Sequence, residues 1–277
     1  MRNARTGAVT DRVKPPAGES FTRVTSAGQG VFFLTGSGLR GESPLAYRLQ
    51  VDAAGRAGQL APVAGDLLPA GCRYIAASPG GTVLAYTVPD MTPRRSTAEA
   101  GVVDLATGQP RIASLPAGSI SALSLANDGQ TLAFQWQPPS GGDPDVYVAA
   151  AAASDWVSQG TVLTARDGLP YDATSPVISA DGRAVYLTVA EPEPAGGPHW
   201  NRLLEVPAGG GEPRVLFELR HQPGSGNFIY MWGPVCRDPA GEWLLAFSSG
   251  YAYLIEISSG GVIRLPFPEG QPYDAAW

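Results

Sequence analysis

A repeat of about 50 residues is the feature that most constrains the fold of this 277-residue chain. Five stretches share one design: an apolar strand, a short turn that contains glycine, and a second apolar strand. They read VTSAGQGVFFLT (24–35), AASPGGTVLAYTV (76–88), SLANDGQTLAFQW (124–136), VISADGRAVYLTV (177–189) and VCRDPAGEWLLAFSS (235–249). The aligned turn glycines are Gly28, Gly80, Gly129, Gly182 and Gly241. This period is the one expected of four-stranded propeller blades.

Two further strands follow in each unit. Pairs of β-type runs joined by a turn are visible at 47–63, 101–116, 145–165, 202–219 and 253–268. The run DVYVAAAAASDWVSQGTVLTA (145–165) is the loosest, because its alanines would also suit a helix. We assign it to strands because the other units have strands at the equivalent position of the repeat. Four strands per unit and no helical periodicity predict an all-β chain with the architecture of a β-propeller.

The turns of the repeat resemble those of a known family. Ser-Pro-Gly-Gly (78–81), Asn-Asp-Gly-Gln (127–130) and Ser-Ala-Asp-Gly (179–182), each between apolar strands, are similar to the repeat of TolB-like, WD-repeat-like propellers. That repeat is usually written Trp-Ser-Pro-Asp-Gly followed by a strand, and no copy here matches it in full. The resemblance extends over nearly the whole chain. It implies the fold, and it implies no particular activity.

The chain ends predict how the ring closes. Pro-Tyr-Asp-Ala occurs at 170–173, before an inner strand, and again at 272–275, close to the last residue. Residues 2–16 match 104–116, the outer strands of a unit. We therefore predict six blades in a single domain, 1–277, with five or seven as alternatives. The predicted blades span 20–65, 66–117, 118–167, 168–222 and 223–270, and the sixth is shared between 1–16 and 271–277. Because that shared blade would lack its second strand, we expect the natural chain to begin before Met1.

Loop lengths predict a binding face. The connections between second and third strands are long, as at 35–45, 88–100, 137–145 and 191–201, and they emerge on one face together with the links between blades. Long loops on a rigid scaffold are where binding usually resides. The candidate binding residues on this face are Arg94, Arg95, Tyr171, Asp172, His199, Trp200, His221, Tyr230, Tyr273 and Asp274.

Each candidate also has an ordinary structural explanation. The two histidines have no carboxylate at a ligand spacing and suit solvent-exposed positions, while Arg94 and Arg95 suit a solvated loop. An aspartate such as Asp172 or Asp274 often accepts hydrogen bonds from its own turn. The aromatic group around Tyr230 would equally pack between blades. We also expect core positions for Trp136, Trp243 and Trp277.

Composition excludes several classes of partner. A net charge of −6 without a basic cluster argues against nucleic acid. No apolar run approaches 18 residues, so we predict no membrane span in this chain, and an upstream signal or anchor would place it outside the cytoplasm. Cys72 and Cys236 have no metal-binding spacing, and their positions in the second and fifth units predict two free thiols.

Signatures of catalysis are missing from the sequence. It has no Gly-x-Ser-x-Gly elbow, phosphate-binding loop, zinc-protease helix or cysteine–histidine motif, and no pattern indicates a catalytic residue, a metal or a cofactor. We predict a non-catalytic binding or scaffold propeller that recognises a protein or cell-envelope partner. One alternative is a lactonase-like hydrolase with a divalent cation on the ring axis, held by Asp172, Asp274 and Asn227. Another is the sensor ectodomain of a membrane-anchored protein.

Overall fold

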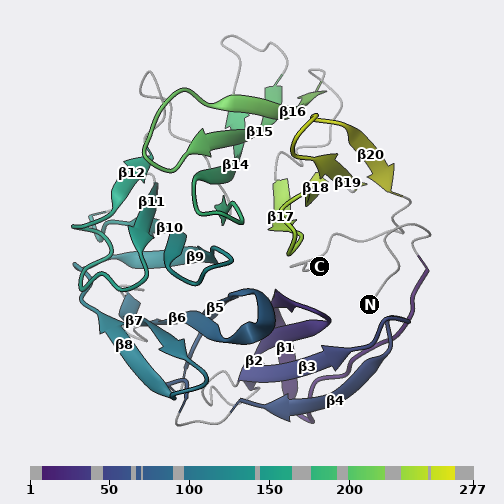
Figure 1. Cartoon of the computed structure of the whole chain (residues 1–277), viewed down its shortest axis with the longest axis vertical. Helices are drawn as coiled ribbons and strands as arrows, with labels where there is room; N and C mark the ends of the chain where they lie inside the picture. Colours follow the sequence, from purple (N-terminus) through teal and green to yellow (C-terminus); the bar gives the residue numbers. More distant parts are fainter. Residues whose placement is uncertain are drawn as a thin grey trace.

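The computed structural model describes residues 8–38, 46–63, 67–69, 71–89, 97–140, 144–163, 176–191, 199–221, 232–248 and 251–265. These residues form five antiparallel sheets of four strands, arranged around a ring (Figure 1). The first sheet contains β1 (Glu19–Gly28), β2 (Val31–Gly38), β3 (Ala46–Val51) and β4 (Ala57–Pro62). The second contains β5 (Tyr74–Ala77), β6 (Val83–Pro89), β7 (Thr97–Asp104) and β8 (Gln109–Ala113), with a short 3-10 helix (Pro79–Gly81) in its first turn.

The remaining three sheets repeat the same order. The third contains β9 (Ser119–Leu125), β10 (Thr131–Gln137), β11 (Asp145–Ala150) and β12 (Thr161–Leu163). The fourth contains β13 (Val177–Ile178), β14 (Ala184–Glu191), β15 (His199–Pro207) and β16 (Arg214–His221). The fifth contains β17 (Trp232–Arg237), β18 (Trp243–Ser248), β19 (Tyr251–Glu256) and β20 (Val262–Leu265). We call these sheets blades 1 to 5.

The structure corrects the blade number from six to five. In the predicted sixth blade, residues 8–16 form no strand pair of their own. They lie instead against blade 1, where the Asp11 carboxylate accepts the Ala57 N–H at 2.8 Å and Val13 packs on the apolar face of the sheet. A β-type sequence pairs only where a partner edge is available, so similarity to an outer strand pair did not make this segment a blade. Residues 271–277 lie outside the described residues.

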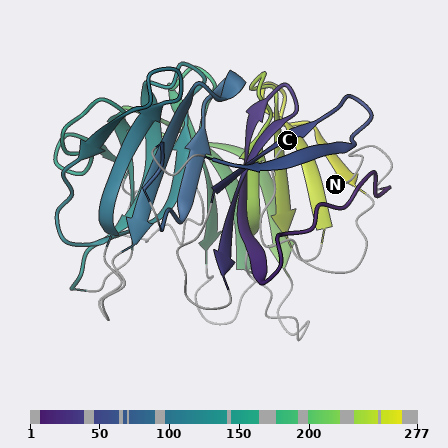
Figure 2. The same cartoon turned by 90° about the horizontal axis from the view of Figure 1, so that it is seen from below.

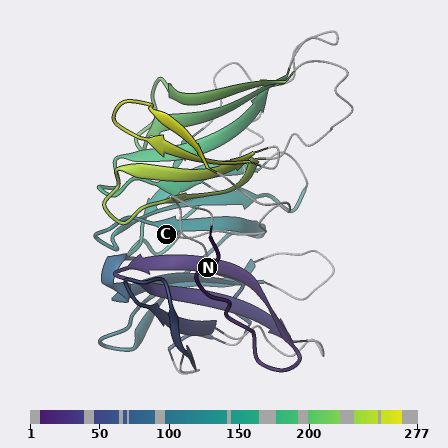
Figure 3. The same ribbon diagram turned by 90° about the vertical axis from the view of Figure 1, so that its right-hand side faces the viewer.

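Most of the core lies between neighbouring blades, and two smaller clusters lie on blade 1 and on blade 5. Four buried clusters join blades 1 and 2, 2 and 3, 3 and 4, and 4 and 5. The contact between blades 4 and 5, for example, packs Tyr186 and Leu203 against Leu244 and Ile255. The strands read as apolar because each central strand buries both of its faces against adjacent blades. The stacking of the sheets is visible from the side in Figure 3.

The short turns between first and second strands gather on one face of the ring, at the upper edge of Figure 2, as predicted. Blades 4 and 5 approach closely there. Gly241 has a φ of +78°, and a Cβ placed on it would lie 2.6 Å from the Ala180 Cβ. Glycine is therefore required at this turn both for its left-handed backbone and for the space it leaves. We call this face the short-turn face.

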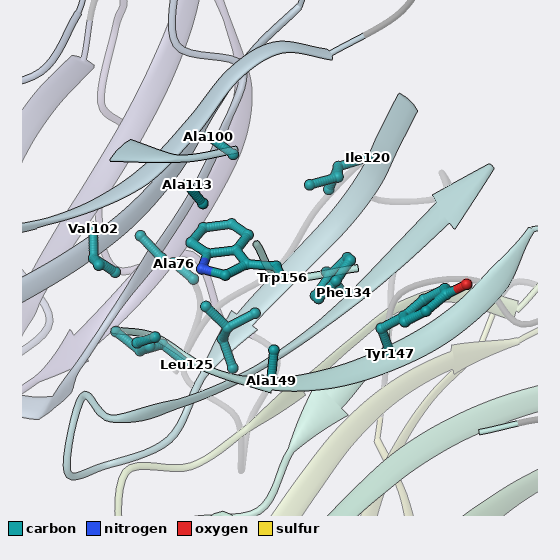
Figure 4. Close-up of a cluster of buried hydrophobic side chains, with 13 residues drawn as sticks. Ala76, Ala100, Val102, Ala113, Ile120, Leu125, Phe134, Tyr147, Ala149 and Trp156 are labelled. Carbon is teal, nitrogen blue, oxygen red and sulfur yellow. The ribbon is translucent and has the colours of Figure 1, made fainter. Parts of the chain in front are cut away.

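A buried tryptophan that sequence reasoning did not single out occupies the contact between blades 2 and 3. Trp156 follows β11 in a turn that crosses to blade 2, where the Ser114 N–H donates to the Ser154 carbonyl at 2.6 Å. Its indole is fully buried and is surrounded by small side chains from both blades (Figure 4). The alanine run in this part of the chain is thereby explained, since β11 is a strand, as predicted, and its alanines leave room for the indole.

The other tryptophans expected in the core are less enclosed. Trp136 and Trp243 are only partly buried, because each lies at or next to the end of a second strand, where the neighbouring blade covers one side of the indole. Trp277 lies outside the described residues. Both cysteines are free, as predicted.

Candidate functional site

The inner strands of the five blades enclose a central channel. β1, β5, β9, β13 and β17 each pair on one side only, so their second edges face the ring axis. Together they line a cavity of about 150 Å³. Ring closure of this kind places a small concave site at the centre of a rigid scaffold, which is where propellers offer polar groups from several blades at once.

The channel lining carries positive charge and hydroxyl groups. Its charged side chains are Arg23 from β1 and Arg237 from β17, and its hydroxyl groups belong to Thr25, Ser26, Tyr74, Ser121 and Ser124. Among the described lining residues there is no carboxylate. The channel therefore favours anionic groups over cations.

Two arginines surround the one aromatic ring of the lining. The Arg23 guanidinium lies 5.1 Å from the centroid of the Tyr74 ring, and that of Arg73 lies 5.6 Å from it. Within the described part of the chain, neither guanidinium has a carboxylate partner. Tyr74 begins β5, and Arg23 lies five residues before the turn glycine Gly28, so this group lies toward the face opposite the short turns. We call Arg23, Arg73 and Tyr74 the arginine–tyrosine group.

A half-buried arginine lies at the other end of the channel. Arg237 donates from Nε to the Ile178 carbonyl at 3.0 Å and from Nη2 to Asn127 Oδ1 at 2.7 Å, and Asn127 Nδ2 donates to the Pro239 carbonyl at 2.8 Å. Blades 3 and 5 are not neighbours in the ring, so the bonds between Asn127 and blade 5 span the channel. Burial lowers the pKa of Arg237, and the neighbouring Asp238 opposes this shift. Since its hydrogen bonds are used within the protein, Arg237 holds the ring together at the short-turn face.

The cysteine thiols are placed differently. Cys72 is buried, and its thiol donates to the Pro69 carbonyl at 3.1 Å. Burial, with a smaller contribution from Glu99, raises the pKa of Cys72 to about 12, so its thiol stays protonated and unreactive at neutral pH. Cys236 lines the channel and is partly exposed.

For three predicted binding residues, His199, Trp200 and His221, the structure describes only the backbone. His199 and His221 are register partners in β15 and β16, at the end of blade 4 remote from the Gly182 turn, and Trp200 is paired with Arg220 in the same ladder. A binding role for these residues stays a prediction. The remaining candidates lie outside the described residues: Arg94, Arg95, Tyr171, Asp172, Tyr230, Tyr273 and Asp274.

Sequence reasoning missed the arginine–tyrosine group and Arg237. Both arginines of the lining belong to first strands of repeat units, TRVTSAG and VCRDPAG, whose other members are apolar or small. A charge within an inner strand was the available signal, because that strand alone borders the axis. The prediction instead looked for function only in loops.

Comparisons with known proteins identify the fold. No protein-family model matches the chain, and no curated protein matches it. Among solved structures, putative TolB from Agrobacterium tumefaciens superposes with a TM-score of 0.56 at 17% identity, over 89% of this chain and 80% of that one. TolB from Acinetobacter baumannii superposes with a TM-score of 0.55 at 15% identity, over 91% of this chain. The fold is that of a TolB-like β-propeller.

This TolB-like propeller is also similar to enzyme-associated propellers. A structure described as one of two prolyl endopeptidases superposes with a TM-score of 0.51 at 15% identity, over 91% of this chain and 37% of that one. The chain spans 55% of the Acinetobacter TolB chain. At these identities the likeness concerns the fold alone.

The described residues contain no group of three histidine, cysteine or acidic side chains arranged to hold a metal ion. The three metal ligands suggested for the lactonase-like alternative lie outside the described residues: Asp172, Asn227 and Asp274. No described helix has the length and apolar character needed to cross a membrane.

Proposed function

We propose that this protein is a non-catalytic binding propeller that recognises an acidic segment of a partner protein at the channel mouth opposite the short-turn face. The observation that carries the proposal is the arginine–tyrosine group. Two guanidinium groups that have no carboxylate partner among the described residues lie around one tyrosine ring, at the edge of a channel with no described carboxylate in its lining.

The chemistry of the group favours a carboxylate on the partner. Guanidinium groups bind carboxylates through paired, charge-assisted hydrogen bonds, which are stronger and more directional than those of an ammonium group. Both guanidinium groups lie within cation–π distance of the same Tyr74 ring, at 5.1 and 5.6 Å from its centroid, so a carboxylate bound near this ring can be attracted by both of them. A cavity of about 150 Å³ accepts one or two side chains and excludes a folded domain. The partner therefore inserts a short segment and rests its remaining surface on the rim.

The rim of this face is predicted to supply further contacts. Arg94, Arg95, His199, Trp200 and His221 remain candidates for it, because the connections that follow second and fourth strands leave from this end of the blades. Tyr171, Asp172, Tyr230, Tyr273 and Asp274 are candidates from the links between blades. In this proposal the rim residues supply most of the surface area buried against the partner, and the channel selects for negative charge.

The test compares two labelled peptides of ten residues, one rich in glutamate and its counterpart with glutamine at the same positions. Fluorescence anisotropy should show binding of the glutamate peptide that weakens as salt is added, and at least tenfold weaker binding of the glutamine peptide. Replacing both arginines (Arg23→Gln with Arg73→Gln) should abolish the preference. Arg111→Gln is the matched control, since Arg111 is an exposed arginine of the outer strand β8.

Two results would contradict the proposal. Equal binding of the two peptides would show that the channel mouth does not select carboxylates. A preference for glutamate that survives in the double variant, or disappears in Arg111→Gln, would place the acidic site elsewhere on the surface.

A further inference from the structure

A second concave site lies on the opposite face, between blades 4 and 5. This groove has a volume of about 570 Å³, within the range of ligand sites. Its floor is the close contact between the turns at Ala180 and Gly241, and its polar lining consists of Asp181, Arg183, Tyr186, Glu205, Glu212 and Arg214. None of these residues belongs to the arginine–tyrosine group or to the channel lining.

The strand register of blade 4 builds one wall of the groove. Tyr186 in β14 is the partner of Glu205 in β15, and Glu205 is the partner of Arg214 in β16. Direct cross-strand partners point to the same side of a sheet, so the three side chains form a row facing blade 5. Arg214 donates from Nε to Glu205 Oε2 at 2.7 Å and from Nη2 to the Ile257 carbonyl of blade 5 at 2.8 Å.

The tyrosine in this row has a hydroxyl without a protein partner. The Tyr186 side chain is only 3% exposed and packs against the core of blade 5, yet no hydrogen bond is made to its hydroxyl by the described residues. The comparable tyrosines of blades 1 and 2 are satisfied. Tyr47 donates to Glu19 at 2.6 Å, and Tyr86 donates to Glu99 at 2.9 Å. Unlike the indole N–H of Trp156, this hydroxyl oxygen is not fully enclosed, so it opens onto the groove, where a ligand can bond to it.

The groove retains more hydrogen-bond acceptors than donors. Glu205, which lines the groove, uses Oε2 for Arg214, while the Arg214 guanidinium is already held by two protein oxygens. Asp181 Oδ1 accepts from Ser179, and its Oδ2 lies 3.9 Å from the well-exposed Arg183. With three carboxylates against two guanidinium groups, the lining also carries an excess of negative charge.

The electrostatics of Tyr186 agree with this arrangement. Burial raises the pKa of Tyr186 to about 12; the charges of Glu205 and Asp181 add to this shift, and those of Arg237 and Arg214 oppose it. The hydroxyl therefore stays neutral at physiological pH, and its oxygen is available as an acceptor beside the carboxylate of Glu205.

We propose that this groove binds a basic side chain, lysine or arginine, presented by a segment of a partner protein. The cation lies between the Tyr186 oxygen and the Glu205 carboxylate, and Asp181 contributes charge at the groove entrance. The pairing satisfies the open tyrosine hydroxyl and neutralises the excess carboxylate. The groove is independent of the acidic-segment site, so one partner could occupy both faces only by wrapping around the ring.

The experiment uses the whole chain and the peptide Gly-Gly-Lys-Gly-Gly, blocked at both ends. Its control replaces lysine with norleucine, which keeps the hydrocarbon stem and removes the charge. NMR titration should show saturable shifts with the lysine peptide and none with the norleucine peptide. Tyr186→Phe should weaken binding at least about tenfold, the effect of losing one hydrogen bond to a charged group. Because the lost hydroxyl has no protein partner, Tyr186→Phe should unfold no earlier than the wild type.

Tyr86→Phe is the matched control. It removes a hydroxyl that donates to Glu99, so it should lower stability and leave lysine-peptide binding unchanged. The Arg23→Gln, Arg73→Gln double variant should also bind this peptide normally. The lysine-groove proposal and the acidic-segment proposal can therefore be refuted independently of each other. Equal binding of the norleucine peptide would overturn the proposal. Unchanged binding by a folded Tyr186→Phe variant would also overturn it.

Discussion

Replacing Trp156 tests the view that contacts between blades stabilise this ring. The indole is fully buried between blades 2 and 3, its centroid lies 5.9 Å from that of Phe134, and its N–H has no hydrogen-bond partner within the described structure. A buried tryptophan covers about 150–250 Å², which at about 25 cal/mol per Å² corresponds to roughly 4–6 kcal/mol as an upper bound. Trp156→Ala should therefore lower the free energy of unfolding by about 3–5 kcal/mol.

Trp156→Phe should behave very differently. It keeps an aromatic ring in the cluster and removes the unpaired N–H, whose burial costs about 1–3 kcal/mol. The two effects oppose each other, since the smaller ring also loses contacts. We expect a net change within about 1.5 kcal/mol of the wild type, so the two variants should differ by at least about 1.5 kcal/mol.

The assay is urea unfolding followed by far-ultraviolet circular dichroism, which does not depend on tryptophan fluorescence. The urea midpoints of the variants are compared where their m-values are equal, so that a difference in midpoint reports a difference in stability. Trp243→Phe serves as a control at a partly buried tryptophan. If Trp156→Phe is as destabilising as Trp156→Ala, the indole N–H makes a stabilising bond and the reasoning fails. A loss below about 1 kcal/mol for Trp156→Ala would show that this contact does not stabilise the ring.

Two further predictions concern the polar network. Arg237→Met should lower the free energy of unfolding by about 2–4 kcal/mol in thermal or urea melts, because Asn127 Oδ1 and the Ile178 carbonyl lose their donor; an effect no larger than that of the exposed Arg111→Met would contradict it. For Tyr47, burial and the bond to Glu19 raise the pKa from 10.0 to about 12. Its stabilising contribution is therefore complete below pH 10 and falls as the pH rises through about 12, so the stability difference between wild type and Tyr47→Phe should shrink over that range. A difference that stays constant between pH 8 and pH 12 would refute the assignment.

The fold was predictable because the repeat is local. Each unit contains its own turns and strands, so the five glycine turns were enough to locate all five sheets. The same locality explains the wrong sixth blade. The period of the repeat defines one blade and carries no information on how many blades form the ring. Residues 8–16 form no strand of a sixth blade and contact blade 1 through the Asp11 carboxylate and Val13.

The candidate sites were less predictable, because each combines residues from separate units. Arg23 and Tyr74 belong to different blades and share no sequence motif, and they meet only because both inner strands border the axis. In the groove, Tyr186 and Glu205 come together through the register of β14 with β15, which depends on the length of their connection and on packing against blade 5.

By itself, the sequence determined the β class, the propeller blade as the building unit, the positions of the short turns and the free state of both cysteines. All of these follow from local turn chemistry, from strand periodicity, or from the large separation between units. Only the tertiary structure decided that five blades form, that Trp156 fills the contact between blades 2 and 3, and that Arg237 spans the axis. These features depend on which strand edges and side chains meet across the ring, and such meetings are set by packing between units that are distant in the chain.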